Sequence, residues 1–191
     1  MKRNILVVVF IINFFSIPLA QSQNWFYVRP GNTGVAGDYH HTITGDRFGN
    51  IWTGGYMPFW SDGSVVRLDS NGVFTCWGNN DGYLPNDRVN AVAFDHNDQL
   101  WVGTDQGIAH YDGQSWEQFT SANSPLIYDQ VRDMVVDNNN EVWATMSEFG
   151  QITQGGVAHY SGTDWELFTS SNSNLPTQVL EGIAVDSQNN K

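Results

Sequence analysis

Two stretches of the chain repeat one another. Residues 95–120 read DHNDQLWVGTDQGIAHYDGQSWEQFT, and residues 137–169 read DNNNEVWATMSEFGQITQGGVAHYSGTDWELFT. Both begin with Asp, place a Trp six residues later, and continue through a Tyr to a second Trp. The leading Asp recurs at positions 46, 95, 137 and 186, at intervals of 49, 42 and 49 residues. A period of roughly 40–50 residues indicates a repeat architecture, which has to be interpreted before any single motif.

Each repeat contains four short segments with β-strand character. In the second repeat they are VNAVAFD, LWVGT, GIAHY and WEQF, and the gaps between them are rich in Gly, Asn, Asp and Ser. These residues form the tight turns of β-hairpins, so each repeat predicts one antiparallel sheet. A four-stranded sheet per repeat is typical of a propeller blade, and neighbouring blades bury each other's apolar faces. The sequence therefore predicts an all-β protein, a β-propeller of four-stranded antiparallel blades.

Several aromatic residues recur at the same place in the repeats. A Trp lies in the second segment of all three. In the second and third repeats a Tyr ends the third segment and a Trp begins the fourth, where the first repeat has Leu68 and Phe74. Because repeats share a core, we interpret these residues as structural positions that pack blade against blade. Stacking of a ligand on these Trp rings is the alternative. The positions are Trp52, Trp101, Trp143, Tyr111, Tyr160, Trp116 and Trp165.

The first 22 residues have a different composition. Lys2 and Arg3 precede an apolar run from Ile5 to Ile12, and small residues follow at positions 20–22. This order is typical of a secretory signal peptide, and the run is too short and interrupted for a membrane span. We therefore expect residues 1–22 to be removed. The remainder is expected to be exported to the periplasm or the cell surface, without membrane insertion of its own.

The spacing also predicts how the ring is built. A fourth-segment aromatic lies 21 residues before the next leading Asp, and Trp25 stands at that distance from Asp46. We expect Trp25 to begin the closing strand of a blade whose other strands come from further C-terminal blades of the same chain. Residues 23–191 are then an incomplete propeller. Its predicted blades are about 38–86, 87–128 and 129–177, and the next blade begins at 178 with one starting strand.

The second repeat carries a recognisable pattern, W-x-G-T followed by G-(I/V)-x-x-Y-D. It resembles the repeat of the two-component regulator propeller family. The first repeat departs from the pattern at residues 53–55 and at Leu68, and the third at residues 144–146. The resemblance implies a propeller fold and a role as an extracytoplasmic sensor module or a secreted surface protein.

One face of the predicted propeller carries the longer connections. The connections between the second and third segments lie on this face, and those of the first and third repeats are extended, over residues 55–63 and 146–156. Insertions that gather on one face of a repeat protein often form its binding surface. We therefore predict a site for an extracellular small molecule or glycan on these connections. The alternative is that the aromatic residues of the connections cover an irregular blade edge. The predicted ligand-binding residues are Tyr56, Phe59, Trp60 and Phe149.

No catalytic, cofactor or metal motif is recognisable in the sequence. The Asx-rich segments 95–98 and 137–140 are better explained as hairpin turns than as calcium loops, and His40-His41 lacks a third ligand. Without the leader the chain has six basic and 20 acidic residues, which disfavours binding of nucleic acid. The single cysteine, Cys76, excludes an internal disulfide.

Three functions remain open at this stage. The first is a non-enzymatic ligand-sensing module, the input part of a larger signalling protein. The second is a secreted or cell-surface adhesion or scaffold propeller. A propeller enzyme of the lyase type is the third, and no motif favours it.

Overall fold

The computed structural model describes residues 39–57, 60–126, 128–147, 155–175 and 180–191. These residues form twelve strands in three separate four-stranded sheets, and no helix occurs among them. Each sheet is antiparallel and its strands follow one another in chain order. The predicted fold class, an all-β propeller of four-stranded blades, is confirmed.

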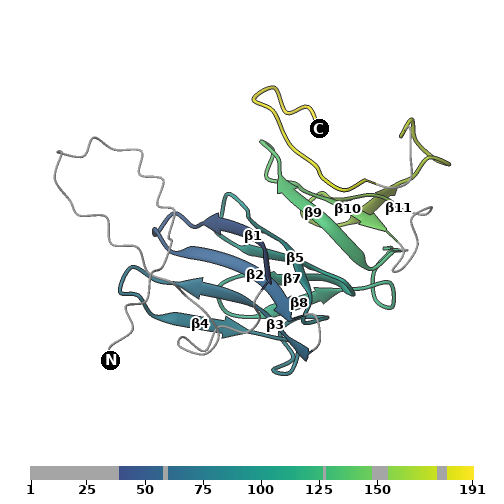
Figure 1. Ribbon diagram of the computed structural model, residues 1–191. Helices are drawn as coiled ribbons and strands as arrows, with labels where there is room; N and C mark the ends of the chain where they lie inside the picture. Colours follow the sequence, from purple (N-terminus) through teal and green to yellow (C-terminus); the bar gives the residue numbers. More distant parts are fainter. Residues whose placement is uncertain (1–38, 58–59, 127, 148–154, 176–179) are drawn as a thin grey trace, which may run out of the picture.

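The three sheets correspond to three blades. Blade 1 contains β1 (Tyr39–Gly45), β2 (Ile51–Met57), β3 (Trp60–Leu68) and β4 (Phe74–Trp77). Blade 2 contains β5 (Val89–Phe94), β6 (Leu100–Thr104), β7 (Gly107–Tyr111) and β8 (Trp116–Phe119). Blade 3 contains β9 (Gln130–Val136), β10 (Val142–Ser147), β11 (Gly155–Tyr160) and β12 (Trp165–Phe168). Figure 1 shows the blades following one another as an open arc.

Apolar contacts between consecutive blades form the core. One cluster joins blade 1 to blade 2 and includes Trp52, Val65, Val89 and Leu100. A second cluster joins blade 2 to blade 3 around Trp101. Each Trp contacts aromatic rings of the next blade: Trp52 meets the edge of the Phe94 ring at 5.4 Å, and Trp101 lies near Tyr160 and Trp165. The blades are thus held by burial of large apolar side chains, the dominant stabilising term in folding.

A glycine in the second strand of blades 1 and 2 allows the first strand of the next blade to approach closely. A Cβ on Gly103 of β6 would lie 2.4 Å from Cγ1 of Val131 in β9, and a Cβ on Gly54 of β2 would lie 2.1 Å from Cγ1 of Val89 in β5. Both valines are completely buried. The missing side chain is therefore what lets each first strand pack directly onto the second strand of the blade before it.

The leading Asp of each repeat organises the turn between the first two strands. Its Oδ1 accepts hydrogen bonds from two backbone N–H groups, as in Asp137, which receives Asn139 N at 2.8 Å and Glu141 N at 3.0 Å. The third residue after the Asp has a positive φ in every copy, which explains why only Gly, Asn or Asp stands there. The residues are Gly49, Asp98, Asn140 and Asn189.

This third turn residue also connects the blades. Asp98 forms an ion pair with Arg47, Asn140 Oδ1 accepts a hydrogen bond from His96 N, and Asn189 Oδ1 accepts one from Asn138 N at 2.9 Å. In each case the contacted residue directly follows the leading Asp of the preceding turn. We call this series of contacts the turn ladder.

Residues 180–191 occupy the place of a following first strand. Ile183 N donates to Asp133 Oδ2 at 3.0 Å, and Asn189 continues the turn ladder. The segment is extended beside β9 (Figure 1) but pairs with no strand among the described residues. The predicted closing strand at Trp25 lies outside the described residues, so that part of the ring remains a prediction.

Replacing Asn140 with glycine tests the turn ladder. Glycine keeps the positive φ and removes only the side-chain contact to His96 N, so we expect the free energy of unfolding to fall by about 1 kcal/mol in chemical denaturation. The control is Gly49→Asn in the turn of blade 1, because the described residues include no preceding blade that an Asn side chain there could contact. A change of less than 0.3 kcal/mol (roughly the noise in such series) for Asn140→Gly would contradict the ladder.

Candidate functional site

Two repeat positions converge at one face of the arc, where first strands begin and second strands end. One lies seven residues before the leading Asp, the other four residues after the recurrent Trp. Unlike the core positions, they carry a different residue in every blade. We call the six residues the inner rim: Tyr39 and Tyr56 in blade 1, Arg88 and Asp105 in blade 2, and Gln130 and Ser147 in blade 3.

A continuous series of polar contacts joins the inner rim across the blades. Arg88 Nη2 donates to the Tyr56 hydroxyl at 2.6 Å, and Arg88 Nε lies 3.4 Å from Asp105 Oδ2. Gln130 Nε2 donates to Asp105 Oδ1 at 3.0 Å, and Ser147 Oγ donates to Gln130 Oε1 at 3.1 Å. The rim residue at the end of each second strand therefore contacts the rim residue of the first strand in its own blade. In blades 1 and 2 it also contacts the first-strand rim residue of the next blade.

The series continues beyond Ser147. Arg132 Nε donates to Ser147 Oγ at 3.1 Å, and its Nη1 lies 3.8 Å from Glu181 Oε2 in the C-terminal segment. Glu181 is largely exposed, so this last ion pair contributes little to stability. The inner rim and the adjoining Arg132 thus bring two arginines together in a chain that has only 8 basic residues and a formal net charge of −12.

Blade 1 adds aromatic rings to the inner rim. His41 stacks on Tyr56 with ring centroids 5.1 Å apart and an interplanar angle of 3°, and Arg88 Cζ lies 3.9 Å from the Tyr56 centroid. Tyr39 lies beside Tyr56 at 6.1 Å. We call these four residues the aromatic–arginine cluster. Two different groups already contact the Tyr56 ring, so the surface it offers a ligand comes mainly from Tyr39 and His41, which are exposed, and from Arg88.

The ligand-binding residues predicted from the sequence are only partly described. Tyr56 lies in the aromatic–arginine cluster, as just given. Trp60 begins β3 and its backbone pairs with Met57, but its side chain is outside the described set. Phe59 and Phe149 are outside the described residues as well. Their role therefore remains a prediction.

Sequence analysis missed Tyr39, His41, Arg88 and Asp105. None lies in an extended connection or in a known motif. Aligning the repeats on their leading Asp would have revealed them, because Tyr39, Arg88 and Gln130 then share one column of unlike residues. Such a column contrasts with the recurrent Trp and Gly columns, which are constrained by packing.

The recurrent histidines belong to the scaffold. His110 stacks on Trp101 at 4.1 Å and His159 on Trp143 at 4.0 Å, in equivalent places of blades 2 and 3. Burial lowers the pKa of His110 below its usual value, despite the nearby carboxylates of Asp95, Glu117 and Asp112. Within the described ranges, no group of three or more His, Cys, Asp or Glu side chains could hold a metal ion.

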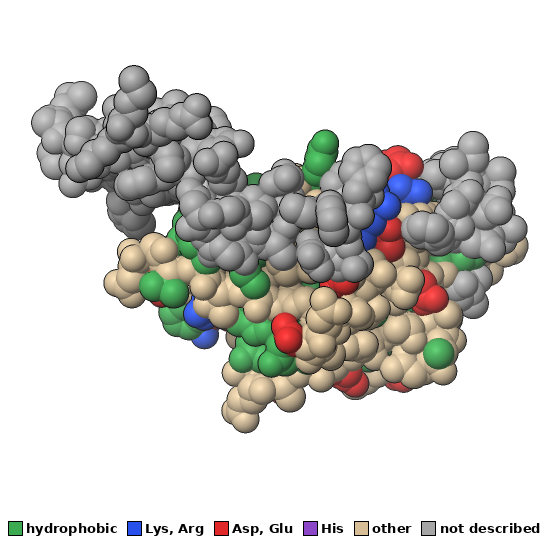
Figure 2. Space-filling view, turned by 60° about the horizontal axis from the view of Figure 1, so that its bottom comes forward, with side chains coloured by type: hydrophobic (Ala, Val, Ile, Leu, Met, Phe, Trp, Pro, Cys, Tyr) green, Lys and Arg blue, Asp and Glu red, His purple; other side chains and the backbone are tan. Residues whose placement is uncertain are grey.

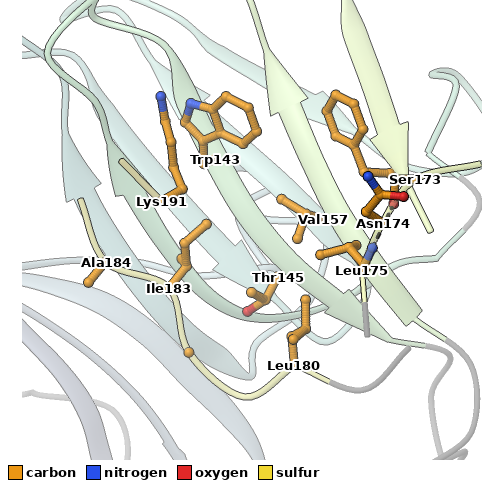
Figure 3. A pocket seen from close by; sticks show the side chains of 12 residues that line it. Trp143, Thr145, Val157, Ser173, Asn174, Leu175, Leu180, Ile183, Ala184 and Lys191 are labelled. Carbon is orange, nitrogen blue, oxygen red and sulfur yellow. Dashed lines mark hydrogen bonds between the residues drawn. The ribbon is translucent and has the colours of Figure 1, made fainter. Parts of the chain in front are cut away.

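A groove of about 560 Å³ lies between blade 3 and the C-terminal segment. Figure 3 shows Trp143, Thr145 and Val157 on the blade side and Leu180, Ile183 and Lys191 on the other. Leu180 stands where Val89 and Val131 stand in the earlier blades, and Thr145 stands where they have Gly54 and Gly103. The groove is thus lined by inter-blade packing positions and lies apart from the inner rim.

Acidic residues outnumber basic ones in the chain, 20 to 8. Figure 2 shows acidic side chains scattered over one face, with few basic side chains among them.

A helix with the length and apolarity for crossing a membrane is not found in the part of the chain that the structure describes.

Known proteins share the repeat and the fold of this chain. Residues 83–106 match the family profile described as two component regulator propeller, so the chain carries that repeat and the resemblance seen in the sequence is confirmed. Among curated proteins none matches the chain in sequence.

Several solved structures share the fold. One is the extracellular domain of a putative hybrid two-component system from B. thetaiotaomicron, with a TM-score of 0.69, 18% identity, and coverage of 90% of this chain and 22% of that one. The extracellular domain of a putative one-component system from the same organism gives a TM-score of 0.64, 19% identity, and coverage of 88% and 22%.

A third similar structure is PorZ, a surface component of the type-IX secretion system of Porphyromonas gingivalis. Its TM-score is 0.60 at 17% identity, with coverage of 84% of this chain and 25% of PorZ. The chain therefore spans about a quarter or less of the length of these structures. At such identities the likeness establishes the β-propeller fold.

Proposed function

We propose that this chain is part of an exported propeller that binds an extracellular ligand at the aromatic–arginine cluster and serves as the input module of a larger signalling protein. The observation that carries the proposal is the contrast between repeat positions. Packing positions recur from blade to blade, whereas the inner rim differs in each blade and gathers Tyr39, His41, Tyr56 and Arg88 at one place. Binding residues on a repeat scaffold are expected to vary in this way.

The composition of the cluster suits ligand binding. Aromatic rings offer flat apolar area with little loss of conformational freedom, and an arginine supplies directed hydrogen-bond donors. The Tyr39 ring is 56% exposed although it lies on a strand and not on a loop tip. Export is supported by the predicted signal peptide and by the extracellular location of two of the similar structures. Signalling is supported by the two-component repeat.

A screen of extracellular small molecules and oligosaccharides by thermal shift of the full exported chain tests the proposal. We expect ligands that raise the melting temperature of the wild type to bind Tyr39→Ala at least tenfold more weakly. The control is Tyr83→Ala, because Tyr83 is also partly exposed but packs against Trp116 of β8, with ring centroids 5.8 Å apart. Ligands whose affinity is unchanged in Tyr39→Ala would refute the proposed site.

A surface scaffold is the second candidate function. The similarity to PorZ, a bacterial surface component, supports it. The gene downstream of the codon for Lys191 discriminates the two. A transmembrane helix followed by a kinase domain would support the sensor, and a C-terminal sorting domain would support the scaffold.

A further inference from the structure

The charge and geometry of Arg88 indicate what kind of ligand the aromatic–arginine cluster accepts. We infer, on the basis of the proposed function, that the ligand carries a carboxylate and that Arg88 binds it. No other part of the inner rim in blades 1 and 2 supplies a positive charge. The inference concerns the charged group of the ligand and not the body to which it is attached.

Arg88 is held in a fixed orientation. Its Nε faces Asp105 Oδ2, its Nη2 donates to the Tyr56 hydroxyl, and its guanidinium lies over the Tyr56 ring. A guanidinium that is already immobilised loses less conformational entropy when it binds a ligand. The side chain is nevertheless 42% exposed, so the immobilised group can still be reached from solvent.

Arg88 has hydrogen-bond donors beyond those that contact the described residues. A guanidinium has five N–H donors in a planar fork that matches a carboxylate. Within the described part of the chain, two of its nitrogens face acceptors, Asp105 through Nε and Tyr56 through Nη2. The outer edge of the fork therefore keeps donors for a bidentate contact, the arrangement in which arginine binds carboxylates most strongly.

The competing explanation is that Arg88 serves only to neutralise the buried Asp105. Asp105 is 5% exposed, and its Oδ1 already accepts hydrogen bonds from Asn90 Nδ2 at 2.8 Å and Gln130 Nε2 at 3.0 Å. The contact to Arg88 is the longest of the three, at 3.4 Å. Both amides reach Oδ1, whereas Oδ2 faces Arg88, so the ion pair neutralises Asp105 and also fixes the orientation of the guanidinium. This contact engages the Nε side of the fork, and we regard Asp105 as the positioning residue for Arg88.

Acetate is the probe that tests this inference, and acetamide is its uncharged counterpart of the same shape. In the full exported chain, labelled with ¹⁵N, the Nε–Hε resonance of each arginine is followed during titration at constant ionic strength. We expect the Arg88 resonance to shift and saturate with acetate and to stay in place with acetamide. Arg47 is the matched control, because its side chain is more exposed (63%) and also faces a carboxylate, that of Asp98.

Variants separate binding from folding. We expect Arg88→Gln to weaken acetate binding at least fivefold, as read from the melting temperature as a function of acetate concentration, and Arg88→Lys to weaken it less because the charge remains. Parallel, unsaturated shifts of Arg88 and Arg47, or an equal response to acetamide, would overturn the inference. An uncharged ligand lost in Tyr39→Ala would overturn it too, while leaving the proposed function intact.

Discussion

Replacing Gly103 with alanine is expected to lower the free energy of unfolding by about 3 kcal/mol, the upper end of what overpacking of a core costs. The new Cβ would lie 2.4 Å from Val131 Cγ1 and 2.8 Å from Met134 Sδ. Both side chains lie in the cluster between blades 2 and 3, and Val131 is completely buried. The new Cβ would also lie 3.0 Å from Val131 Cβ, so a rotamer change of the valine does not relieve the clash, whereas the flexible Met134 side chain can yield. Urea denaturation followed by tryptophan fluorescence measures the change.

A double-mutant cycle shows whether the clash is the cause. Val131→Ala removes the nearest atom, so the double variant should be less destabilised than the sum of the two single variants predicts. The control is Gly45→Ala, since the nearest atom to a Cβ there is Asn50 O at 3.7 Å, an ordinary contact. Additive effects in the cycle, or an equal loss in the Gly45 control, would contradict the role assigned to Gly103.

Replacing Asp137 with alanine should lower the free energy of unfolding by about 3 kcal/mol, because removing one member of a buried polar group leaves the others unpaired. Asp137 is completely buried. It accepts two backbone N–H groups of its turn, the Trp143 indole N–H at 3.0 Å, and a contact from Lys191 Nζ at 2.6 Å. The matched control is Asp186→Ala, which removes the same turn contacts at an exposed position. Its loss should stay below 1 kcal/mol (roughly that of an exposed contact).

Acidification gives a second measurement on Asp137. Burial alone would raise the pKa of its carboxyl, but the contacts from Lys191, Glu141 N, Trp143 and Asn139 N outweigh burial and hold the pKa well below the usual 3.8. A group with a depressed pKa stabilises the fold above its unfolded pKa, and this contribution is lost as pH falls toward the folded value. The stability difference between wild type and Asp137→Ala should be constant at neutral pH and shrink below about pH 4. A difference that grows on acidification would contradict this account.

The fold could be predicted because its determinants are local and repeated. The leading Asp and the Trp six residues later recur in all three blades, and a Gly follows that Trp by two residues in blades 1 and 2. Each meets a packing or turn requirement within one blade or its neighbour. Their spacing is therefore visible in the sequence. The turn ladder could not be predicted, since it joins residues 44 and 51 positions apart, and nothing in the sequence alone shows that Asn140 reaches His96.

The candidate site could be predicted from the sequence only in part. Tyr56 was predicted because it lies in an extended connection, and the structure places it in the aromatic–arginine cluster; its role in binding remains a prediction. Tyr39 begins β1 and Arg88 directly precedes β5, and the two are brought together through Tyr56, which both contact. Contacts of this kind depend on how far one sheet rotates against the next, which no pattern of residue types encodes.

The inner rim has a consequence for how such proteins diversify. Its six side chains project from strand ends that the buried glycines and tryptophans hold in place. Asp105, Gln130 and Ser147 are themselves buried and hydrogen-bond to one another, so an exchange at one of them requires a matching exchange at its partner. Tyr39 is exposed, and a substitution there leaves this buried network intact. Changes in recognition are therefore expected to arise from single substitutions at the exposed position and from paired substitutions at the contacting ones.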